Sequence, residues 1–339
     1  MANEPQSEQD STRYSGFPFQ ALEVSLDSLD RNMSIHEITK KLLGNQLAVT
    51  IEAIPGIHAG EDIEAVHKTR VGFRRIRSQL RILKPLFKKK VLQSFRTNSK
   101  LIGQVLGTVR DLDVLHIYLS SAFQEHAPAE NFQTAIWKPF FIDQYLKAQD
   151  QLLGQLESEQ FSEFIQSFYN FCKDIELGAK QPEKVIEKGF PTLKSYVSSM
   201  LINQFQNVQI RQQALSEQPI DTNFHKLRIE VKRFRYILDF FTPILKVAPT
   251  LDLINSLTNL QDNLGIINDH VTAERIIGPL LEKNSPLRDH NMAVFLSEYS
   301  KKISLENDAL QASFHHSWKT FQKSNPESIL QNCFSEIEI

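Results

Sequence analysis

The sequence predicts an all-α protein made of two helical bundles, and three observations lead to this fold class. Apolar residues recur at spacings of three and four, the usual hairpin turn pairs are missing, and one motif occurs twice. Of the 339 residues, 41% are hydrophobic and only 12 are glycine, with no Asn-Gly, Asp-Gly or Gly-Gly pair. Tight hairpins favour such pairs because type I′ turns need positive φ angles. The sequence therefore disfavours a β-sandwich or barrel.

The clearest helical periodicity begins at Val66. Residues at spacings of three and four gather on one face of a helix, and here they are Phe73, Ile76, Leu80, Leu83 and Phe87. Gly56 before the start and Pro85 near the end bracket about five turns. Further periodic runs over residues 35–54, 91–119 and 132–156, and aromatic segments over 140–171 and 295–321, supply about four helices per bundle.

Two segments of the sequence match without gaps. HKTRVGFRRIR, which begins at His67, aligns with HKLRIEVKRFR, which begins at His225, at an offset of 158 residues. The same offset aligns Leu106-Gly107 with Leu264-Gly265, and residues 34–115 with residues 192–273. This self-similarity predicts an internal duplication.

The duplication suggests how the chain is organised. We predict a polar N-terminal tail over residues 1–33, a first bundle over 34–180, a second bundle over 181–325 and a C-terminal tail over 326–339. The first tail is rich in Ser, Glu, Gln and Asp, a composition that buries little apolar surface.

Charge is distributed unevenly along the chain, although the formal net charge is only −2. Residues 65–110 contain thirteen Lys or Arg and no Asp or Glu. Removing these from the totals of 38 basic and 40 acidic residues leaves 25 basic residues against 40 acidic ones elsewhere. An acidic protein with one basic region favours a local anion site.

Basic residues follow the polar face of one helix in each half, and we call these two rows the basic stripes. They are His67, Arg70, Arg74, Arg75, Arg77 and Arg81 in the first half, and His225, Arg228, Lys232, Arg233 and Arg235 in the second. Like charges at this spacing repel one another. Either Asp111, Asp113 and Asp269 neutralise the stripes, or a polyanion lies along them with its phosphate oxygens on the Arg and Lys side chains.

A histidine opens each stripe. Beside phosphate the charged imidazolium is favoured, so His67 and His225 would add donors and make the affinity rise as the pH falls. The alternative for each is a surface or core histidine that contacts no ligand.

The pattern H-x-x-R-x-x-x-[RK]-R-x-R, found twice and followed each time by Leu-Gly and then Asp, resembles the CHAD family, the conserved histidine α-helical domain. The resemblance covers about residues 30 to 325. It implies two four-helix bundles related by a pseudo-twofold axis, with the basic helices facing a central groove or pore. It also implies that the ligand is inorganic polyphosphate, bound and not hydrolysed. We expect no cofactor and no metal.

The motif positions carried over from the family are His67, Arg70, Arg74, Arg75 and Arg77, then His225, Arg228, Lys232, Arg233 and Arg235. Arg81 and Lys84 extend the first stripe, but their counterparts are Asp239 and Thr242, so we expect the first half to carry more of the affinity. Some family members have an added triphosphatase domain with an ExExK signature. Here Glu336-Ile337-Glu338 lies at the other end of the chain with no following Lys, which favours a stand-alone module.

Three other functions stay open at this point. An enzyme acting on phosphoanhydrides needs clustered carboxylates for Mg²⁺, and Asp111, Asp113 and Asp269 are the candidates; the chain has no P-loop, HExxH or nucleophile elbow. A nucleic-acid binder needs aromatic residues among the basic ones, yet Phe73 and Phe234 fall on the apolar faces. A scaffold could instead dock an acidic protein tail.

The remaining features concern location and single residues. The polar start and the lack of a long apolar run favour the cytoplasm and no membrane contact. The expected partners are polyphosphate, its storage granules or a polyphosphate-metabolising enzyme, and any binding of nucleic acid is expected to be weak.

Cys172 and Cys333 lack metal-like spacing and are expected to be thiols. We interpret Gly107 and Gly265 as places where another helix approaches closely, with backbone contact to the ligand as the alternative.

Overall fold

The computed structural model describes residues 33–58, 63–126, 138–179, 193–245, 247–280 and 290–332. Within these ranges every regular element is a helix, and an isolated bridge between Phe87 and Ala179 is the single β-type pairing. The predicted all-α fold class is therefore confirmed. Residues 1–32 of the predicted N-terminal tail, the predicted bundle boundary at residues 180 and 181, and Cys333 lie outside the described residues.

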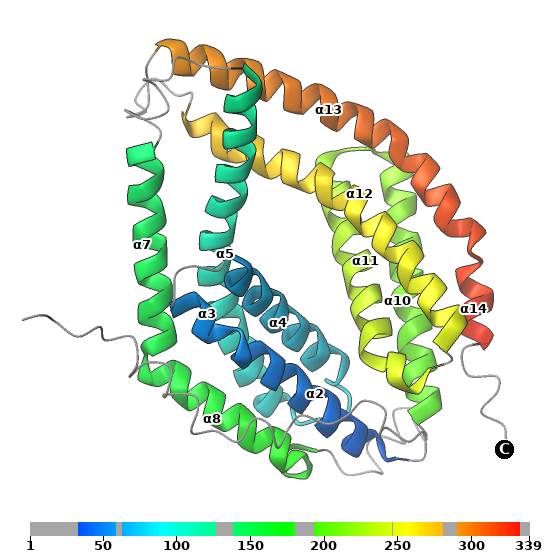
Figure 1. Ribbon diagram of the computed structural model, residues 1–339. Helices are drawn as coiled ribbons and strands as arrows, with labels where there is room; N and C mark the ends of the chain where they lie inside the picture. The colour runs from blue at the N-terminus through cyan, green and yellow to red at the C-terminus, as the bar shows by residue number, and fades with distance from the viewer. Residues whose placement is uncertain are drawn as a thin grey trace, which may run out of the picture. The chain divides into compact units, whose positions relative to one another are not determined.

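The described chain forms two compact units (Figure 1). Unit 1 contains the described residues up to Val114 and those from Asp143 to Leu193, and unit 2 contains 115–142 and the residues from Lys194 onward. The chain leaves unit 1 within the helix α5 (Lys89–His126) and returns within α7 (Lys138–Glu157). The division thus falls inside helices, where no loop signal marks it in the sequence.

Unit 1 is built around the basic helix of the first half. Besides parts of α5 and α7, its elements are α2 (Ile35–Glu52), α3 (Ile54–His58), α4 (Ile63–Ile82), α8 (Glu159–Lys173) and the 3-10 turn η4 (Ile175–Gly178). α4 packs against α2 and α3, and α2 also packs against α8 (Figure 1).

Local signals in the sequence set the ends of these helices. Ser34 and Glu37 form a capping box at the start of α2, in which each side chain accepts a hydrogen bond from the backbone N–H of the other. α4 ends before Pro85, as expected, because the residue before a proline disfavours helical geometry. The aromatic segment 140–171 forms two helices, α7 and α8, because Ser158 caps a new start by accepting from the Phe161 N–H at 3.1 Å.

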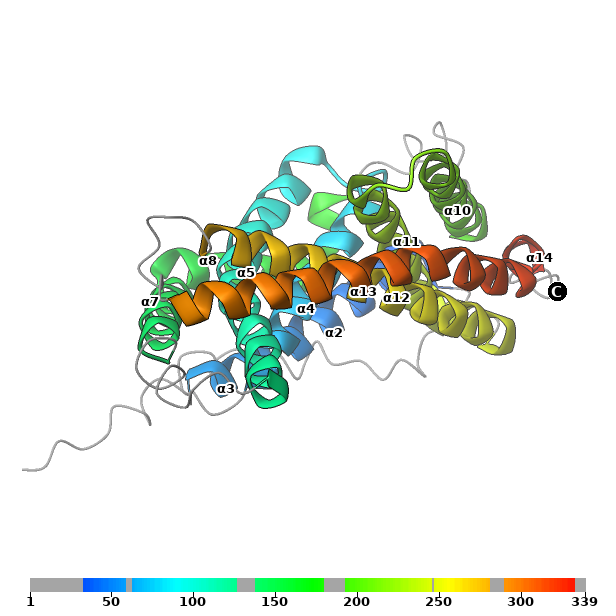
Figure 2. The ribbon, with the colours of Figure 1, turned by 90° about the horizontal axis from the view of Figure 1, so that it is seen from above.

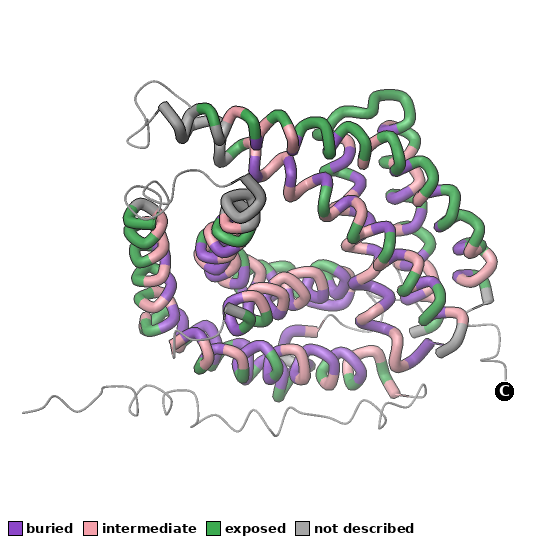
Figure 3. Tube along the Cα trace, turned by 45° about the horizontal axis from the view of Figure 1, so that its top comes forward, coloured by how far each residue is buried: buried purple, intermediate pink, exposed green. Residues whose placement is uncertain are grey.

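Phenylalanine rings join α4 and α5 to α8 in the core of unit 1. The Phe73 ring lies 6.2 Å from the rings of both Phe161 and Phe164, and the Phe95 ring of α5 stacks on Phe168 at 4.7 Å. All five residues predicted on the apolar face are fully buried: Phe73, Ile76, Leu80, Leu83 and Phe87. The first three lie on α4, whereas Leu83 and Phe87 follow its end at Ile82. Figure 3 shows the buried faces of the helices in purple.

Unit 2 contains the second basic helix. Besides the end of α5 and the start of α7, its elements are α10 (Leu193–Glu217), α11 (Asp221–Phe241), the 3-10 turn η5 (Thr242–Ile244), α12 (Val247–Leu280), α13 (His290–Lys323) and α14 (Pro326–Asn332). α12 packs against both α11 and α13, and Figure 2 shows the long α13 running along α12.

Aromatic rings also fix the orientation of α11. The Phe234 ring contacts Phe205 of α10 at 5.7 Å, and the Phe224 ring meets Phe314 of α13 edge-on at 5.5 Å. Phe234, Leu238 and Phe241 are buried, as the periodicity predicts. The basic side of α11 therefore points away from this core.

The segment predicted as a C-terminal tail begins with a helix. α14 packs on α12 and α13, and its Leu330 is 4% exposed. Gln209 of α10 also donates a hydrogen bond to Glu327 Oε1 at 3.0 Å. These tertiary contacts stabilise α14, whose sequence is too short and too polar to predict a helix or to form a stable one in isolation.

Three pairs of helices share the offset found in the sequence. The first described residues of α2, α4 and α5 are Ile35, Ile63 and Lys89, and those of α10, α11 and α12 are Leu193, Asp221 and Val247. Each pair is separated by 158 residues, as the aligned motifs are. The duplication itself and the pseudo-twofold relation stay predictions.

Two glycines in these helices have opposite surroundings. A Cβ atom at Gly72 of α4 would lie 2.7 Å from Thr50 Cγ2 and 2.9 Å from Thr50 Cβ on α2, whereas a Cβ at Gly265 of α12 would meet no described atom within 4 Å. Close approach of α2 to α4 therefore requires a glycine at position 72. Open space at position 265 leaves only the intrinsic cost of glycine in a helix.

We expect Gly72→Ala to lower the free energy of unfolding by roughly 1–3 kcal/mol, because overpacking pushes two buried helices apart. The matched substitution Gly265→Ala should raise it by up to about 1 kcal/mol, since alanine favours the helix more than glycine does. Urea denaturation monitored by circular dichroism measures both changes. A shift in the same direction for both variants would contradict this account of the helix contacts.

Candidate anion-binding site

The basic stripe of the first half lies on α4, on the side opposite its phenylalanines. The buried positions Phe73, Ile76 and Leu80 turn the residues between them away from the core. Half-buried members of the stripe are His67, Arg70, Arg74, Arg75 and Arg77, and the exposed member is Arg81. Half-buried arginines keep their stems on apolar surface while their guanidinium groups reach outward.

The stripe of the second half lies on α11 in the same way. Its half-buried members are Arg228, Lys232, Arg233 and Arg235, and its exposed member is His225. The structure thus places all the predicted binding residues of each half on one face of one helix.

His67 lies in a strongly positive environment. Burial lowers the pKa of its imidazole, and the Arg110, Arg74 and Arg70 guanidinium groups lower it further, while Glu64 acts in the opposite direction. Its Nδ1 atom is buried and has no hydrogen-bond partner among the described residues. The neutral form of His67 is therefore favoured until an anion comes near it.

His225 differs from its counterpart. Its Nδ1 lies 2.9 Å from Oδ1 of Asn268 on α12, which can accept a hydrogen bond from the ring N–H. At the offset of 158 residues, the position of Asn268 corresponds to Arg110. The second half therefore gives its histidine a neutral acceptor where the first half places a cation.

Arginine side chains of α4 lie against glycines of α5. A Cβ atom at Gly103 would be 3.8 Å from Nη1 of Arg77, and one at Gly107 would be 3.7 Å from Nε of Arg70. In the second half, Gln261 occupies the position that corresponds to Gly103, and its Oε1 accepts a hydrogen bond from Nε of Arg235 at 2.9 Å. Arg235, the counterpart of Arg77, is thus held by the side-chain amide of Gln261.

The interpretation of Gly107 and Gly265 as places of close helix approach is wrong. The nearest atoms to a Cβ at Gly107 belong to the Arg70 side chain, and a Cβ at Gly265 would meet no described atom within 4 Å. A long side chain that lies across a helix needs room at one position, and this need leaves no periodic signal in the sequence.

An acidic residue on α11 neutralises part of the second stripe. Glu230 forms an ion pair with Arg233, one turn further along the same helix, and its side chain is 10% exposed. Gln204 of α10 donates to Glu230 Oε2 at 2.8 Å and holds this carboxylate in place. Gly72 stands at the corresponding position of α4, so the first stripe has no carboxylate there.

Asp113, one of the carboxylates considered as a neutralising group for the stripes, is buried, with 4% of its surface exposed. Burial raises its pKa, while Arg110 and a hydrogen bond from Tyr145 of α7 act in the opposite direction. Asp113 is therefore tied to α7, and the acid that pairs with Arg233 is Glu230, which the sequence analysis did not consider.

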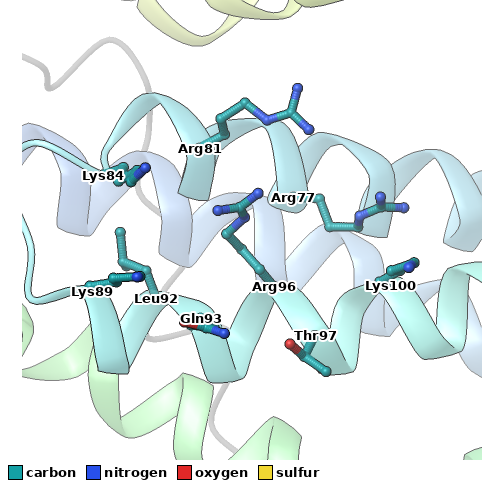
Figure 4. Close-up of a pocket in the computed structure, with 9 residues that line it drawn as sticks. All are labelled: Arg77, Arg81, Lys84, Lys89, Leu92, Gln93, Arg96, Thr97 and Lys100. Atoms are coloured by element: carbon teal, nitrogen blue, oxygen red, sulfur yellow. The ribbon is translucent and has the colours of Figure 1, made fainter.

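A pocket of about 370 Å³ lies between the end of α4 and the start of α5. Its lining consists of Arg77, Arg81, Lys84, Lys89, Leu92, Gln93, Arg96, Thr97 and Lys100. Six of these nine residues are basic and none is acidic. In Figure 4 the Arg96 side chain rises into the space between the two helices, with Lys84 and Lys89 on one side and Arg77 and Lys100 on the other.

Three of these cations are binding candidates that the sequence analysis missed. Lys89, Arg96 and Lys100 lie on α5, outside the repeated motif. The signal that could have found them is the run of basic residues over 65–110, which extends well beyond the stripe on α4. Burial lowers the pKa of Arg77, and repulsion from the neighbouring Arg96 guanidinium lowers it further.

Comparison with known proteins places these observations in a family. The model of the CHAD domain matches residues 41–278, which is more than half of the chain. The chain belongs to the CHAD family. No curated protein matches the chain.

Two solved structures are similar to this CHAD protein in fold. The crystal structure of the CHAD domain from the plant Ricinus communis is 20% identical, with a TM-score of 0.66, and the match covers 86% of this chain and 96% of that one. PptA from Streptomyces chartreusis is 13% identical, with a TM-score of 0.67, over 85% of this chain and 100% of the other. The central groove or pore implied for CHAD proteins stays a prediction.

Metal sites and membrane-spanning helices are both absent from the part of the chain that the structure describes. The described residues contain no group of three or more His, Cys, Asp or Glu side chains placed to hold a metal ion. None of the described helices combines the length and apolar character needed to span a membrane.

We expect Arg96→Gln to raise the free energy of unfolding of the CHAD protein by roughly 0.5–1 kcal/mol at low ionic strength, because it relieves repulsion with several cations at about 0.2–0.5 kcal/mol each. The gain should shrink as added salt screens the charges. The control Lys147→Gln removes an exposed cation that lies 2.8 Å from Asp143, so it should leave stability unchanged or slightly lower. Urea denaturation at two salt concentrations tests both, and a salt-independent effect of Arg96→Gln would contradict the prediction.

Proposed function

We propose that this protein binds inorganic polyphosphate without hydrolysing it, through the basic stripes of α4 and α11 and the adjoining cations of α5. The observation that carries the proposal is the pocket in unit 1, where six cations meet and no acidic residue lines the wall. A polyanion would bind these cations through charge-assisted hydrogen bonds. Family membership supports the choice of polyphosphate, the ligand that the resemblance implies.

The spacing of the stripe suits a linear chain of phosphates. Arg70, Arg74, Arg77 and Arg81 follow one another along one side of α4, so their positions recur about every 5 Å along the helix axis. Each phosphate of the polymer carries negative charge, so one chain can be held at several successive points. Binding of this kind releases counterions and weakens steeply as salt increases.

Buried aromatic residues distinguish this surface from a typical single-stranded nucleic-acid site. Phe73 and Phe234 are fully buried, and Tyr236 is 6% exposed. The Arg235 guanidinium also lies over the Tyr236 ring, 5.4 Å from its centre. Because bases need exposed rings for stacking, a nucleic acid would contact the stripes mainly through its backbone, and we expect weaker binding.

The proposal extends to the setting of the protein. It would act in the cytoplasm at polyphosphate granules, or beside an enzyme that makes or degrades polyphosphate. Storage, buffering and delivery of the polymer would all use the same basic residues.

Calorimetric titration with long-chain polyphosphate at two salt concentrations tests the proposed function. We expect tight, salt-sensitive binding that the double variant Arg74→Glu/Lys232→Glu weakens by about a hundredfold or more, because each charge-assisted hydrogen bond contributes roughly 1.5–3 kcal/mol. The matched control Lys173→Glu/Lys319→Glu changes the net charge equally at exposed positions on α8 and α13, and it should bind nearly as the wild type does.

The same titration separates the alternatives. Equal affinity for a single-stranded oligonucleotide of similar charge would indicate a general polyanion binder. Release of free phosphate during the titration would indicate an enzyme. The absence of any binding, or an equal loss in the control variant, would contradict the proposal.

Binding should also take up protons at His67. Its pKa is lowered in the free protein and should rise when phosphate lies nearby, so the bound state holds more protons. The extra affinity is fully present below the pKa of the free protein and is lost as the pH rises through the pKa of the complex. Calorimetry in buffers with different ionisation enthalpies should show less proton uptake for His67→Gln than for the wild type, with His315→Gln on α13 as the control. Equal uptake by His67→Gln and the wild type would rule out this role.

A further inference from the structure

The pocket between α4 and α5 differs from the rest of the basic surface in how its charges are arranged. The stripe on α4 sets cations in a row, one turn after another. The pocket instead surrounds one point with cations from α4, from α5 and from the turn between them, and Arg96 stands near its middle (Figure 4). Such a cluster is best matched by a compact anion of high charge density.

The start of α5 adds to this positive potential. Lys89 is the first residue of a 38-residue helix, and Lys89, Leu92 and Gln93 of its first turns line the pocket. The backbone amides of a first helical turn have no partners within the helix, and the helix dipole favours an anion there. The pocket therefore combines six side-chain cations with a helix N-terminus.

The second half of the chain has no equivalent cluster in its sequence. At the offset of 158 residues, Arg77 corresponds to Arg235, which is basic. The other five cations correspond to Asp239, Thr242, Val247, Ile254 and Thr258. A site that depends on the whole cluster can thus belong to unit 1 alone.

We propose that this pocket is the part of the basic surface that takes the end of a phosphate chain, and that it binds a short oligophosphate within unit 1 without help from α11. This proposal rests on the proposed function and names the part of the polymer that the pocket takes. An internal phosphate of the chain has one ionisable oxygen, whereas a terminal phosphate has two, so the chain end carries the highest charge density. The stripe of α4, which shares Arg77 and Arg81 with the pocket, then continues along the internal phosphates.

A nucleoside triphosphate carries the same oligophosphate chemistry, and the lining of the pocket argues against it. Leu92 is the one apolar residue in the lining, and no aromatic side chain contributes to it. A base would therefore gain little from stacking. Inorganic tripolyphosphate should bind more tightly than ATP, in which one end of the triphosphate is blocked by the nucleoside.

Calorimetry with tripolyphosphate, ATP and long-chain polyphosphate tests the assignment on the full chain. For the wild type we expect one tripolyphosphate per protein molecule. The variant Arg96→Gln/Lys100→Gln should weaken tripolyphosphate binding at least tenfold, while long-chain polyphosphate weakens less because the stripes remain. The variant Arg228→Gln/Lys232→Gln on α11 should have the reverse pattern, and Lys173→Gln/Lys319→Gln serves as the matched control. Circular dichroism and thermal melting confirm that each variant is folded.

Chain length supplies a second readout. If the pocket holds chain ends, a short and a long polyphosphate preparation should displace bound tripolyphosphate equally when compared at the same concentration of chain ends. Displacement that instead follows the total phosphate concentration would overturn the assignment of the chain end. Tighter binding of ATP than of tripolyphosphate would overturn it as well.

The outcomes separate this proposal from the proposed function. Binding of long chains without binding of tripolyphosphate, or tripolyphosphate binding that is unchanged in Arg96→Gln/Lys100→Gln, overturns the pocket and leaves the proposed function standing. Binding of tripolyphosphate in the pocket without binding of long chains supports the pocket and contradicts the proposed function. Failure of both ligands to bind overturns both.

Discussion

Packing of phenylalanine rings on the apolar faces of α4 and α11 is the constraint on which the candidate site depends. Because Phe73 lies against Phe161 and Phe164, α4 cannot rotate about its axis without exposing a ring. Phe234 and Phe224 hold α11 in the same manner through Phe205 and Phe314. The direction in which each arginine points is thus decided by residues on the opposite side of its helix. The chemistry of the basic face depends on aromatic core packing.

The two halves use related helices with different charge environments. On α11 the cations have protein partners: Glu230 pairs with Arg233 and Gln261 with Arg235, while Asn268 accepts from His225. The corresponding positions in the first half are Gly72, Gly103 and Arg110. The first half therefore lacks these three acceptors, and an anion would lower the repulsion between neighbouring cations such as Arg77 and Arg96. The expectation, drawn from Asp239 and Thr242, that the first half carries more of the affinity stays a prediction.

Much of this arrangement could be predicted from the sequence, because helical periodicity places Phe73, Ile76 and Leu80 on one face and the basic stripe on the other. Contacts between helices could not be predicted in this way. Arg96 and Lys100 line the pocket only because α5 lies beside α4. Gly107 leaves room for Arg70 only because the Arg70 side chain lies across α5 at that position. The helix α14 was missed because its order comes from packing on α12 and α13.

The absence of acidic residues from the pocket lining has a consequence for how much folded protein a cell maintains. A ligand that binds only the native state adds RT ln(1 + [L]/Kd) to its stability. Unit 1, whose cations repel one another, would gain most from an anion. If the proposed anion were scarce, the folded fraction would fall and more chains would be open to proteolysis. The abundance of the protein would then follow the supply of its own ligand, without any change in its synthesis.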